Sequence, residues 1–242
     1  MQIIPAIDLR YGGVVRLAQG DDERRTVYDV DPMVMLARCA AAGIDLIHVV
    51  DLDAAFGGDP QRELIEQLAA VGSPKIELGG GLRDRAAVEW ALNAGCERVI
   101  LGSMVAKNFP AFQEIVEAFP GRIVPAVEVA GETEELKIAG WTESAPMSLP
   151  ELCQRLKGLP CPAVLVTDVE RDGTLEGPNI LLSRRVGHNS GLPAIVSGGV
   201  RSLEDLRAAQ VPEIGAVIVG KALYDGVFTV EEAVAYLREN GS

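Results

Sequence analysis

Short runs of apolar residues alternate with longer stretches of helical periodicity along the whole chain. The apolar runs predict eight strands, at residues 3–8, 46–51, 75–79, 98–102, 122–128, 163–168, 194–198 and 216–220. The stretches between them predict helices, for example at 31–43, where Asp31 is the expected N-cap, Pro32 opens the first turn and Gly43 follows the last. Alternating strands and helices form a parallel sheet, and eight such units is the number found in a (β/α)8 barrel.

An open, doubly wound sheet is the alternative α/β fold. That fold usually carries a GxGxxG motif after its first strand, and this chain has none there. The pattern therefore favours the α/β class and, within it, a TIM barrel.

Several short motifs recur at a nearly constant distance along the chain. PAIDL at 5–9 returns as PAVEV at 125–129, and the Gly-Gly-Leu-Arg at 80–83 returns as Gly-Gly-Val-Arg at 198–201. Asp51 and Asp168 follow similar apolar runs in the same register, as do Gly102 and Gly220. The offsets lie between 117 and 120 residues. This repetition predicts one barrel domain over residues 1–242, built from two similar half-barrels at about 1–120 and 121–242.

The composition is that of a globular protein with a sizeable core, because 48% of the 242 residues are hydrophobic and 24% are charged. The net charge of −13 argues against nucleic acid as a partner, since binding to the phosphate backbone depends on clustered Lys and Arg. The N-terminus lacks a basic segment followed by a long apolar one, and no apolar run is long enough to cross a bilayer. We therefore expect a cytoplasmic protein without a membrane partner.

The four cysteines show no CxxC spacing and share no metal-ligand spacing with the two histidines. We expect the cysteines to be reduced and mostly buried, and we expect no metal site. These residues are Cys39, Cys96, Cys153, Cys161, His48 and His188.

Two carboxylates end the first strand of each predicted half. Asp8 ends the first strand and Glu128 ends the fifth, so the repeat places them on opposite sides of the barrel at its C-terminal face, where barrel active sites lie. A facing pair of carboxylates is suited to acid and base catalysis when the surroundings separate their pKa values. The alternative is that each carboxylate caps the loop or helix that follows it.

Glycine-rich segments end the third and seventh strands, where free backbone N–H groups at the start of a helix favour phosphate. The loops after the fourth and eighth strands stand beside them. Two such sites predict a small bisphosphate ligand lying across the barrel mouth, whereas the alternative is that the glycines serve tight turns alone. The predicted phosphate-binding residues are Gly80, Gly81, Arg83, Gly102, Ser103, Gly198, Gly199, Gly220 and Lys221.

Three loops allow two interpretations each. The charged segment 20–28 could be a lid over the site or a solvated loop, and Trp141 could stack on a flat substrate ring or pack locally. The segment 171–174, Arg-Asp-Gly-Thr, could bind ligand or form a turn.

The chain resembles one family over nearly its whole length. The motifs that carry the resemblance are IIPAIDLRYGGVVRL, HVVDLDAAF, GGGLR, TDVERDGTLEGPN, SGGV and VGKALYDGVFT. In combination they are similar to the ProFAR isomerases, which act in histidine biosynthesis on a phosphoribosylformimino aminoimidazole carboxamide ribonucleotide. The resemblance implies a half-barrel-repeat (β/α)8 fold, a substrate with two phosphates, and an Amadori rearrangement of an aminoaldose to an aminoketose that needs no metal or organic cofactor.

The resemblance also implies roles for individual residues. Asp8 is the implied proton acceptor at C2′ of the sugar, and position 128 is the implied proton donor that opens the furanose ring. The family usually has Asp at this second position, whereas this chain has Glu128, which keeps the acid and adds one methylene. The other implied substrate-binding residues are Arg16, Gly20, Asp51, Trp141, Thr167, Asp168 and Thr174.

Alternative functions stay open from the sequence. The sibling cyclase that makes imidazole glycerol phosphate shares the architecture, but its Cys and Lys after the first strand fit less well than PAIDLRYGGVVRL. A dual-substrate isomerase that also processes phosphoribosylanthranilate is chemically close. A noncatalytic phosphosugar-binding barrel would follow if Glu128 disables the site. We expect the chain to be a monomer.

Overall fold

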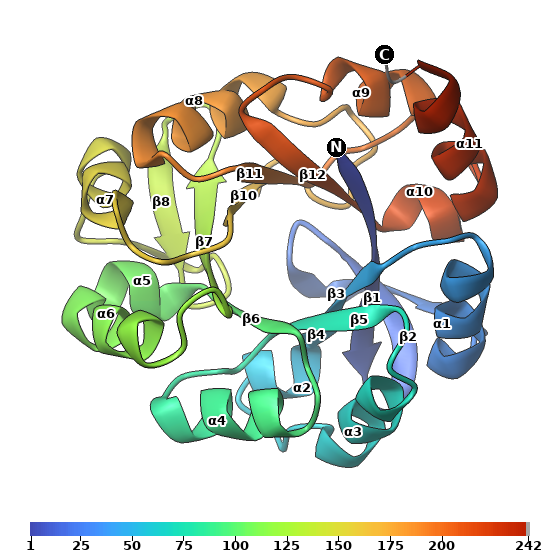
Figure 1. Cartoon of the computed structure of the whole chain (residues 1–242), viewed down its shortest axis with the longest axis horizontal. Coiled ribbons are helices and arrows are strands. Elements are labelled where there is room, and N and C mark those ends of the chain that lie inside the picture. Colours follow the sequence, from blue (N-terminus) through green and yellow to red (C-terminus); the bar gives the residue numbers. More distant parts are fainter. Residues whose placement is uncertain (241–242) are drawn as a thin grey trace.

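Eight parallel strands close into a barrel, and the helices form a ring outside them (Figure 1). The computed structural model describes residues 1–240. Around the barrel, the strands are β1 (Gln2–Arg10), β4 (Leu46–Asp51), β5 (Lys75–Gly79), β6 (Arg98–Leu101), β7 (Ile123–Ala130), β10 (Val164–Asp168), β11 (Ala194–Ser197) and β12 (Ile214–Val219). Pairing of β12 with β1 and of β7 with β10 completes the circle. The predicted (β/α)8 fold is confirmed, and each predicted strand lies within two residues of its expected bounds.

The helices follow the strands in the expected alternation. Their bounds are α1 (Pro32–Ala41), α2 (Leu52–Ala55), α3 (Arg62–Ala70), α4 (Arg85–Asn93), α5 (Ser103–Lys107), α6 (Phe109–Ala118), α7 (Leu149–Leu156), α8 (Ile180–Ser190), α9 (Leu203–Ala208), α10 (Lys221–Tyr224) and α11 (Val230–Asn240). The predicted start of α1 is confirmed, because the Asp31 carboxylate accepts a hydrogen bond from the Met33 backbone N–H at 2.7 Å and Pro32 opens the helix.

Two apolar cores lie on the two faces of the barrel wall. The larger core fills the space between strands and helices and contains Ile7, Leu36 and Phe112. The smaller core fills the lumen and contains Ile4 and Ala6. Successive side chains of a strand point to opposite faces, so the next residue of β1 after Ala6 that faces the lumen is Asp8. The strands thus aim particular residues at the barrel mouth.

Two hairpins extend the barrel and were not predicted. The strands β2 (Gly13–Ala18) and β3 (Asp21–Tyr28) pair antiparallel after β1, and β8 (Glu135–Ile138) and β9 (Glu143–Ser144) form a second pair after β7. The expectation of a loop at 20–28 is therefore wrong for most of that segment. Its charges suggested a loop, but they form ion pairs along an exposed strand, including one between Arg25 and Asp22 at 2.6 Å.

Backbone conformations agree at equivalent positions of the two predicted halves. Gly80 and Gly198 have φ angles of +91° and +90°, a region that favours glycine. Gly102 and Gly220 each precede a short helix with ψ near −95°, at −94° and −95°. These pairs fit the repeat read from the sequence. The division of the chain near residue 120 stays a prediction.

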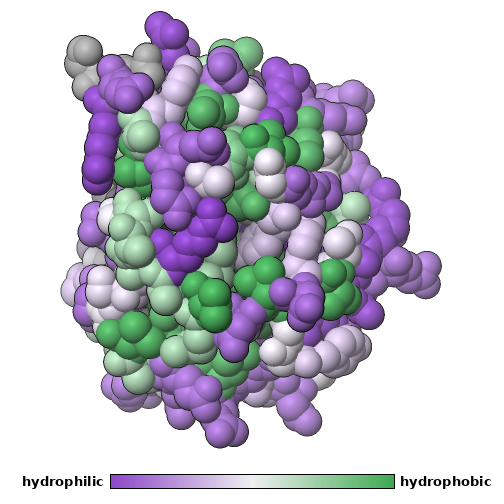
Figure 2. All heavy atoms as spheres, turned by 90° about the vertical axis from the view of Figure 1, so that its right-hand side faces the viewer, coloured by the Kyte–Doolittle hydropathy of each residue, from purple (hydrophilic) through white to green (hydrophobic). Residues whose placement is uncertain are grey.

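The surface over α1, α10 and α11 mixes hydrophilic and apolar residues, with the hydrophilic ones spread over the whole face (Figure 2). Within residues 1–240, none of the helices has the length and apolar character needed to span a bilayer. All four cysteines are buried and unpaired, as predicted.

Candidate active site

Asp8 lies at the C-terminal end of β1, where its side chain faces the lumen and is almost fully buried. Its Oδ2 accepts a hydrogen bond of 2.7 Å from Nη1 of Arg16, which comes from β2 of the first hairpin. The other terminal nitrogen of Arg16, Nη2, donates to the Ala6 carbonyl at 2.8 Å. The hairpin that the sequence did not predict thus supplies the partner that orients the predicted base.

Glu128 occupies the matching place on β7, four strands away around the barrel. It pairs in register with Thr167 of β10, so these two residues stand side by side at the mouth. Burial raises the pKa of Glu128 to about 7, partly offset by a hydrogen bond from Trp141, while the negative charge of Asp172 raises it further. A carboxyl group with this pKa is protonated in about half of the molecules at neutral pH and is available as an acid.

Trp141 lies at the tip of the hairpin between β8 and β9, with a φ of +70°. Its ring is so close to Gly20 that a Cβ built on this glycine would lie 2.6 Å from Cε3. The indole therefore connects the two hairpins across the site and reaches Glu128 at the same time. Local packing and contact with a substrate are both compatible with this position, and stacking on a substrate stays a prediction.

Asp172 is a site residue that the sequence reasoning missed. It sits in the loop after β10, where its backbone N–H donates to the Asp168 carbonyl and its carbonyl accepts from Gln19 of the first hairpin. Burial raises the pKa of Asp172 to about 6, with Arg16 and His48 lowering it and Asp8 raising it. A Cβ built on Gly198 would lie 3.3 Å from Cα of Asp172, so this residue lies beside the glycine-rich segment after β11. The Arg-Asp-Gly-Thr segment was a candidate ligand loop, but its carboxylate was not singled out.

Asp51 and Asp168 lie at equivalent strand ends, and both accept hydrogen bonds from the loops that follow them. Asp51 accepts hydrogen bonds from the backbone N–H groups of Ala54 and Gln61, at 3.1 and 2.8 Å. Asp168 accepts from the backbone of Glu170 at 3.1 Å and from Nδ2 of Asn179 at 2.8 Å. Their carboxylates are engaged within the protein, so direct contact of either with a substrate stays a prediction.

The remaining predicted residues line the two glycine-rich segments or the turn after β10. Arg83 donates to the Ala55 carbonyl at 2.9 Å, and the Ser103 hydroxyl accepts from the Ala139 N–H at 3.0 Å. Lys221 forms an ion pair with Asp225 at 2.6 Å. Thr174 donates to the Arg171 carbonyl at 2.8 Å, which is the contact of a turn residue.

Arg16 also reaches the second of the two predicted phosphate sites. A Cβ built on Gly220, which precedes α10, would lie 2.2 Å from Nη2 of Arg16, so the guanidinium fits only because this residue has no side chain. The Nε of Arg16 is buried and has no hydrogen-bond partner among residues 1–240. A cation with an unused donor beside a helix start is suited to an anion.

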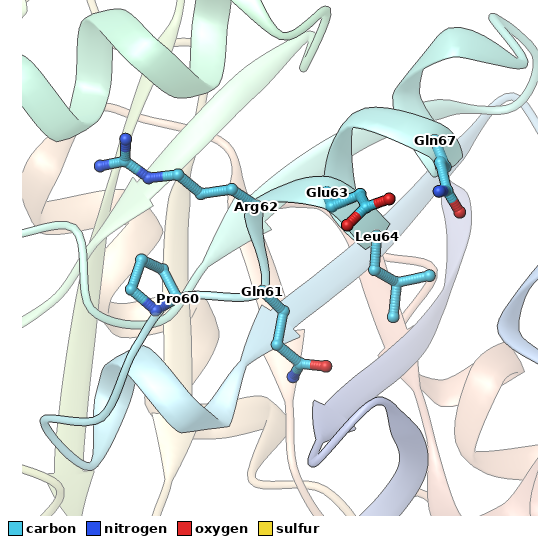
Figure 3. Close-up of a pocket in the computed structure, with 6 residues that line it drawn as sticks. All are labelled: Pro60, Gln61, Arg62, Glu63, Leu64 and Gln67. Carbon is cyan, nitrogen blue, oxygen red and sulfur yellow. The ribbon is translucent and has the colours of Figure 1, made fainter.

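A separate pocket runs along the start of α3 on the outside of the barrel (Figure 3). Its lining residues are Pro60, Gln61, Arg62, Glu63, Leu64 and Gln67. None of the predicted site residues is among them, so the pocket is not the candidate active site. Within residues 1–240, no group of three His, Cys, Asp or Glu side chains is arranged to hold a metal ion.

Comparison with known proteins shows the family of the chain. Residues 2–229 match the family model described as histidine biosynthesis protein. A relative from Geotalea daltonii is 39% identical over 246 residues, which cover 100% of both chains. A relative from Sorangium cellulosum is 41% identical over 97% of this chain and 98% of its own, and one from Paramagnetospirillum magneticum is 38% identical over 98% and 100%. All three are named 1-(5-phosphoribosyl)-5-((5-phosphoribosylamino)methylideneamino) imidazole-4-carboxamide isomerase.

Proposed function

This chain belongs to the histidine biosynthesis protein family, and on that basis we propose that it is an isomerase that converts ProFAR, an aminoaldose, into the corresponding aminoketose. The observation that carries the proposal is the pair of carboxylates on opposite strands of the barrel mouth. Asp8 is oriented by a cation, and Glu128 has a pKa raised to about 7. One group is thereby suited to take a proton and the other to give one.

The first step opens the sugar ring. Glu128, in its protonated form, donates its proton to the furanose oxygen while the bond from that oxygen to C1′ breaks. The electron pair of the amino nitrogen forms a double bond to C1′, which gives a protonated imine. Burial of Glu128 supports this role because a carboxyl group in water would be ionised at neutral pH.

The second step moves a hydrogen along the chain of the opened sugar. The Asp8 carboxylate takes the proton from C2′, and the electrons of that bond shift toward the imine nitrogen to give an enolamine. Return of a proton to C1′ and loss of the hydroxyl proton at C2′ then give the aminoketose. Arg16 holds the Asp8 carboxylate in one orientation for this transfer, through its 2.7 Å hydrogen bond.

The two glycine-rich segments support binding of a substrate with two phosphates. They stand on opposite sides of the mouth, after β5 and β11, with the two carboxylates between them.

We also propose that the protein works as a monomer in the cytoplasm, a reducing compartment in which its four unpaired cysteines would persist. In this proposal the bisphosphate substrate is its partner, and nucleic acid and membranes are not.

The test is a turnover assay of the purified chain with ProFAR and, separately, with phosphoribosylanthranilate, using Asp8→Asn as the inactive control. We expect conversion of ProFAR to the aminoketose in the wild type and none in the control. Conversion of both substrates would identify a dual-substrate isomerase. Binding of ProFAR by calorimetry without conversion would instead support a noncatalytic phosphosugar-binding barrel and contradict the proposal.

A further inference from the structure

Tyr224 connects the short helix α10 to the first strand and to the first hairpin. Its hydroxyl donates a hydrogen bond of 2.9 Å to the carbonyl of Ala6, in the middle of β1. The guanidinium carbon of Arg16, on β2, lies over the Tyr224 ring at 5.4 Å from its centre. Three segments that are separate in the sequence therefore meet at this one side chain.

The Ala6 carbonyl also accepts a hydrogen bond from Arg16. Nη2 of Arg16 donates to this oxygen at 2.8 Å. The pairing of β1 with β12 ends at Pro5 and Val219, so Ala6 is the first residue of β1 beyond that pairing. A carbonyl oxygen has two lone pairs, and here the guanidinium and the phenol donate to the same oxygen. The two side chains are thereby fixed relative to each other as well as to β1.

Arg16 lies against the backbone at the start of α10 as well. A Cβ built on Gly220 would overlap Nη2, Cζ and Nε of Arg16, so the guanidinium packs on bare backbone at this point. Gly220 and Tyr224 are four residues apart, a spacing that places two residues on the same side of a helical turn. One turn of α10 thus presents a glycine and an aromatic ring to the same cation.

The hairpin that carries Arg16 makes a second contact with this part of α10. The ring of Tyr28, at the end of β3, lies 4.9 Å from that of Tyr224, with an angle of 34° between their planes. The Tyr28 hydroxyl donates to Oδ1 of Asp225 at 2.6 Å, and Oδ2 of that carboxylate accepts from Lys221. The hairpin is therefore docked on two adjacent residues, Tyr224 and Asp225.

The ring stands in only one of the two halves of the barrel. In the first half, the residue equivalent to Tyr224 lies 118 places earlier in the chain and is Ala106, in α5. The glycine before α5 faces an acid, because a Cβ built on Gly102 would lie 3.6 Å from Oε2 of Glu128. The glycine before α10 faces Arg16 instead. The ring thus accompanies the cation, which indicates a role toward Arg16 and not a general role in closing the barrel.

We propose that Tyr224 is a positioning residue whose ring holds the guanidinium of Arg16 in place against Asp8. A long arginine side chain loses rotamer freedom when it is held in one conformation, and the attraction between a cation and an aromatic face offsets that loss. The ring thereby favours the conformer in which Nη1 of Arg16 reaches Oδ2 of Asp8 at 2.7 Å. The catalytic part of this inference rests on the proposed isomerase function, because Asp8 is the base in that proposal.

The test compares three variants of the full-length chain with the wild type. Tyr224→Leu removes the ring and the hydroxyl, whereas Tyr224→Phe removes the hydroxyl alone. Phe228→Leu is the matched control, because it removes a buried aromatic ring from the larger core just after α10. Crystal structures of the variants show the position of Arg16. Steady-state kinetics with ProFAR and the melting temperature are measured on the same preparations.

In Tyr224→Leu we expect Arg16 to leave its single conformer and its hydrogen bond with Asp8 to break in a large share of the molecules. We expect kcat to fall about tenfold while KM changes by less than about threefold, because the base loses its fixed orientation. Tyr224→Phe should keep Arg16 in place and keep kcat within about threefold of the wild type. Phe228→Leu should lower the melting temperature without moving Arg16 or changing kcat. Tyr224→Met serves as the second ringless variant if Tyr224→Leu does not fold.

An Arg16 side chain that keeps its place on Asp8 in a folded ringless variant would overturn the inference, whatever the activity. An equal displacement of Arg16 in Tyr224→Phe would overturn the role of the ring. An equal displacement in Phe228→Leu would overturn the inference too, since it would show a general loosening around α10.

Two further outcomes separate this inference from the proposed function. Displacement of Arg16 in the ringless variant of a chain whose wild type does not convert ProFAR would support the positioning role and contradict the isomerase function. A wild type that converts ProFAR, with the same kcat in a variant whose Arg16 is displaced, would overturn the catalytic part of the inference and leave the isomerase function intact.

Discussion

Arg16 binds Asp8 and the second predicted phosphate site at once. Nη1 donates to Oδ2 of Asp8 at 2.7 Å, while Nη2 lies where a Cβ of Gly220 would be. One guanidinium therefore connects the proposed base with the place where a phosphate of the substrate is expected. Binding and proton transfer are linked through the position of this side chain.

We predict that Asp8→Asn reduces isomerisation of ProFAR by at least about 100-fold, because the variant keeps the volume and polarity of the side chain but removes the base. Arg16 can still donate to the amide oxygen, so substrate binding should change little. Steady-state kinetics and calorimetry on the same preparation measure the two effects. Retention of more than about half of the wild-type turnover would show that Asp8 is not the base.

Glu128 is expected to act only while protonated, so kcat should decline as the pH rises above about 7. Glu128→Gln should abolish turnover. Glu128→Asp should lower it, since the shorter side chain draws the carboxyl group back from Trp141 and Gly102, which now lie close to it. Rates measured from pH 5 to pH 9 check these outcomes. A marked rise in turnover for Glu128→Asp would mean that the site is shaped for aspartate, and turnover of Glu128→Gln equal to wild type would place the donor elsewhere.

The same carboxyl group should make stability depend on pH. Its pKa is about 7 in the folded chain and near 4.5 when exposed, so the unfolded state ionises first as the pH rises. Stability from this group is therefore fully present below about 4.5 and is lost as the pH rises through 7. We predict that Glu128→Gln is more stable than the wild type at pH 8, by roughly 3 kcal/mol, and nearly equal to it at pH 4. Urea denaturation at both pH values measures the difference, and equal stabilities at pH 8 would contradict the raised pKa of Glu128 in the folded state.

Asp172→Asn should lower kcat by at least about tenfold and remove any inflection near pH 6 from the rate profile. Asp168→Asn, at the end of β10 just before this loop, is the matched control. Because Asp168 accepts hydrogen bonds from Glu170 and Asn179, its replacement should lower the melting temperature more than it changes the pH profile. If Asp168→Asn rather than Asp172→Asn alters the profile, the assignment of the acidic group in this loop is wrong.

The barrel and its two facing carboxylates could be predicted because they depend on local periodicity. Asp8 and Glu128 end continuous apolar runs that predict buried strands, and the repeat places them at one level. The first hairpin could not be predicted in this way, since β3 buries none of its charged residues and has the composition of a loop.

Other parts of the site depend on contacts between distant segments. Asp172 lies at the mouth because its loop bonds to Gln19, more than a hundred residues earlier in the chain. The bond between Glu77 and His48 needs the register of β4 with β5, which no single run of sequence reveals. Residues of this kind are found once strands are paired, and spacing along one segment carries no signal for them.

Two anions should bind at the barrel mouth when the protein is crystallised with sulfate or phosphate. We expect one near Gly80, Gly81 and Ser103, and the other near Gly198, Gly199 and Lys221, because backbone N–H groups at strand ends and helix starts favour anions. The second anion should also contact Arg16, whose Nε has no partner among residues 1–240.

The two sites can be tested separately. Arg16→Gln should weaken binding of the second anion and leave binding of the first unchanged. The anion occupancies in crystals grown under the same conditions measure both effects. Replacement of Arg16 also frees Asp8 from its 2.7 Å partner, so this variant should lose turnover even at saturating substrate. An anion at only one of the two positions in wild-type crystals would contradict the bisphosphate substrate, because the argument for it depends on two equivalent sites 118 residues apart in sequence.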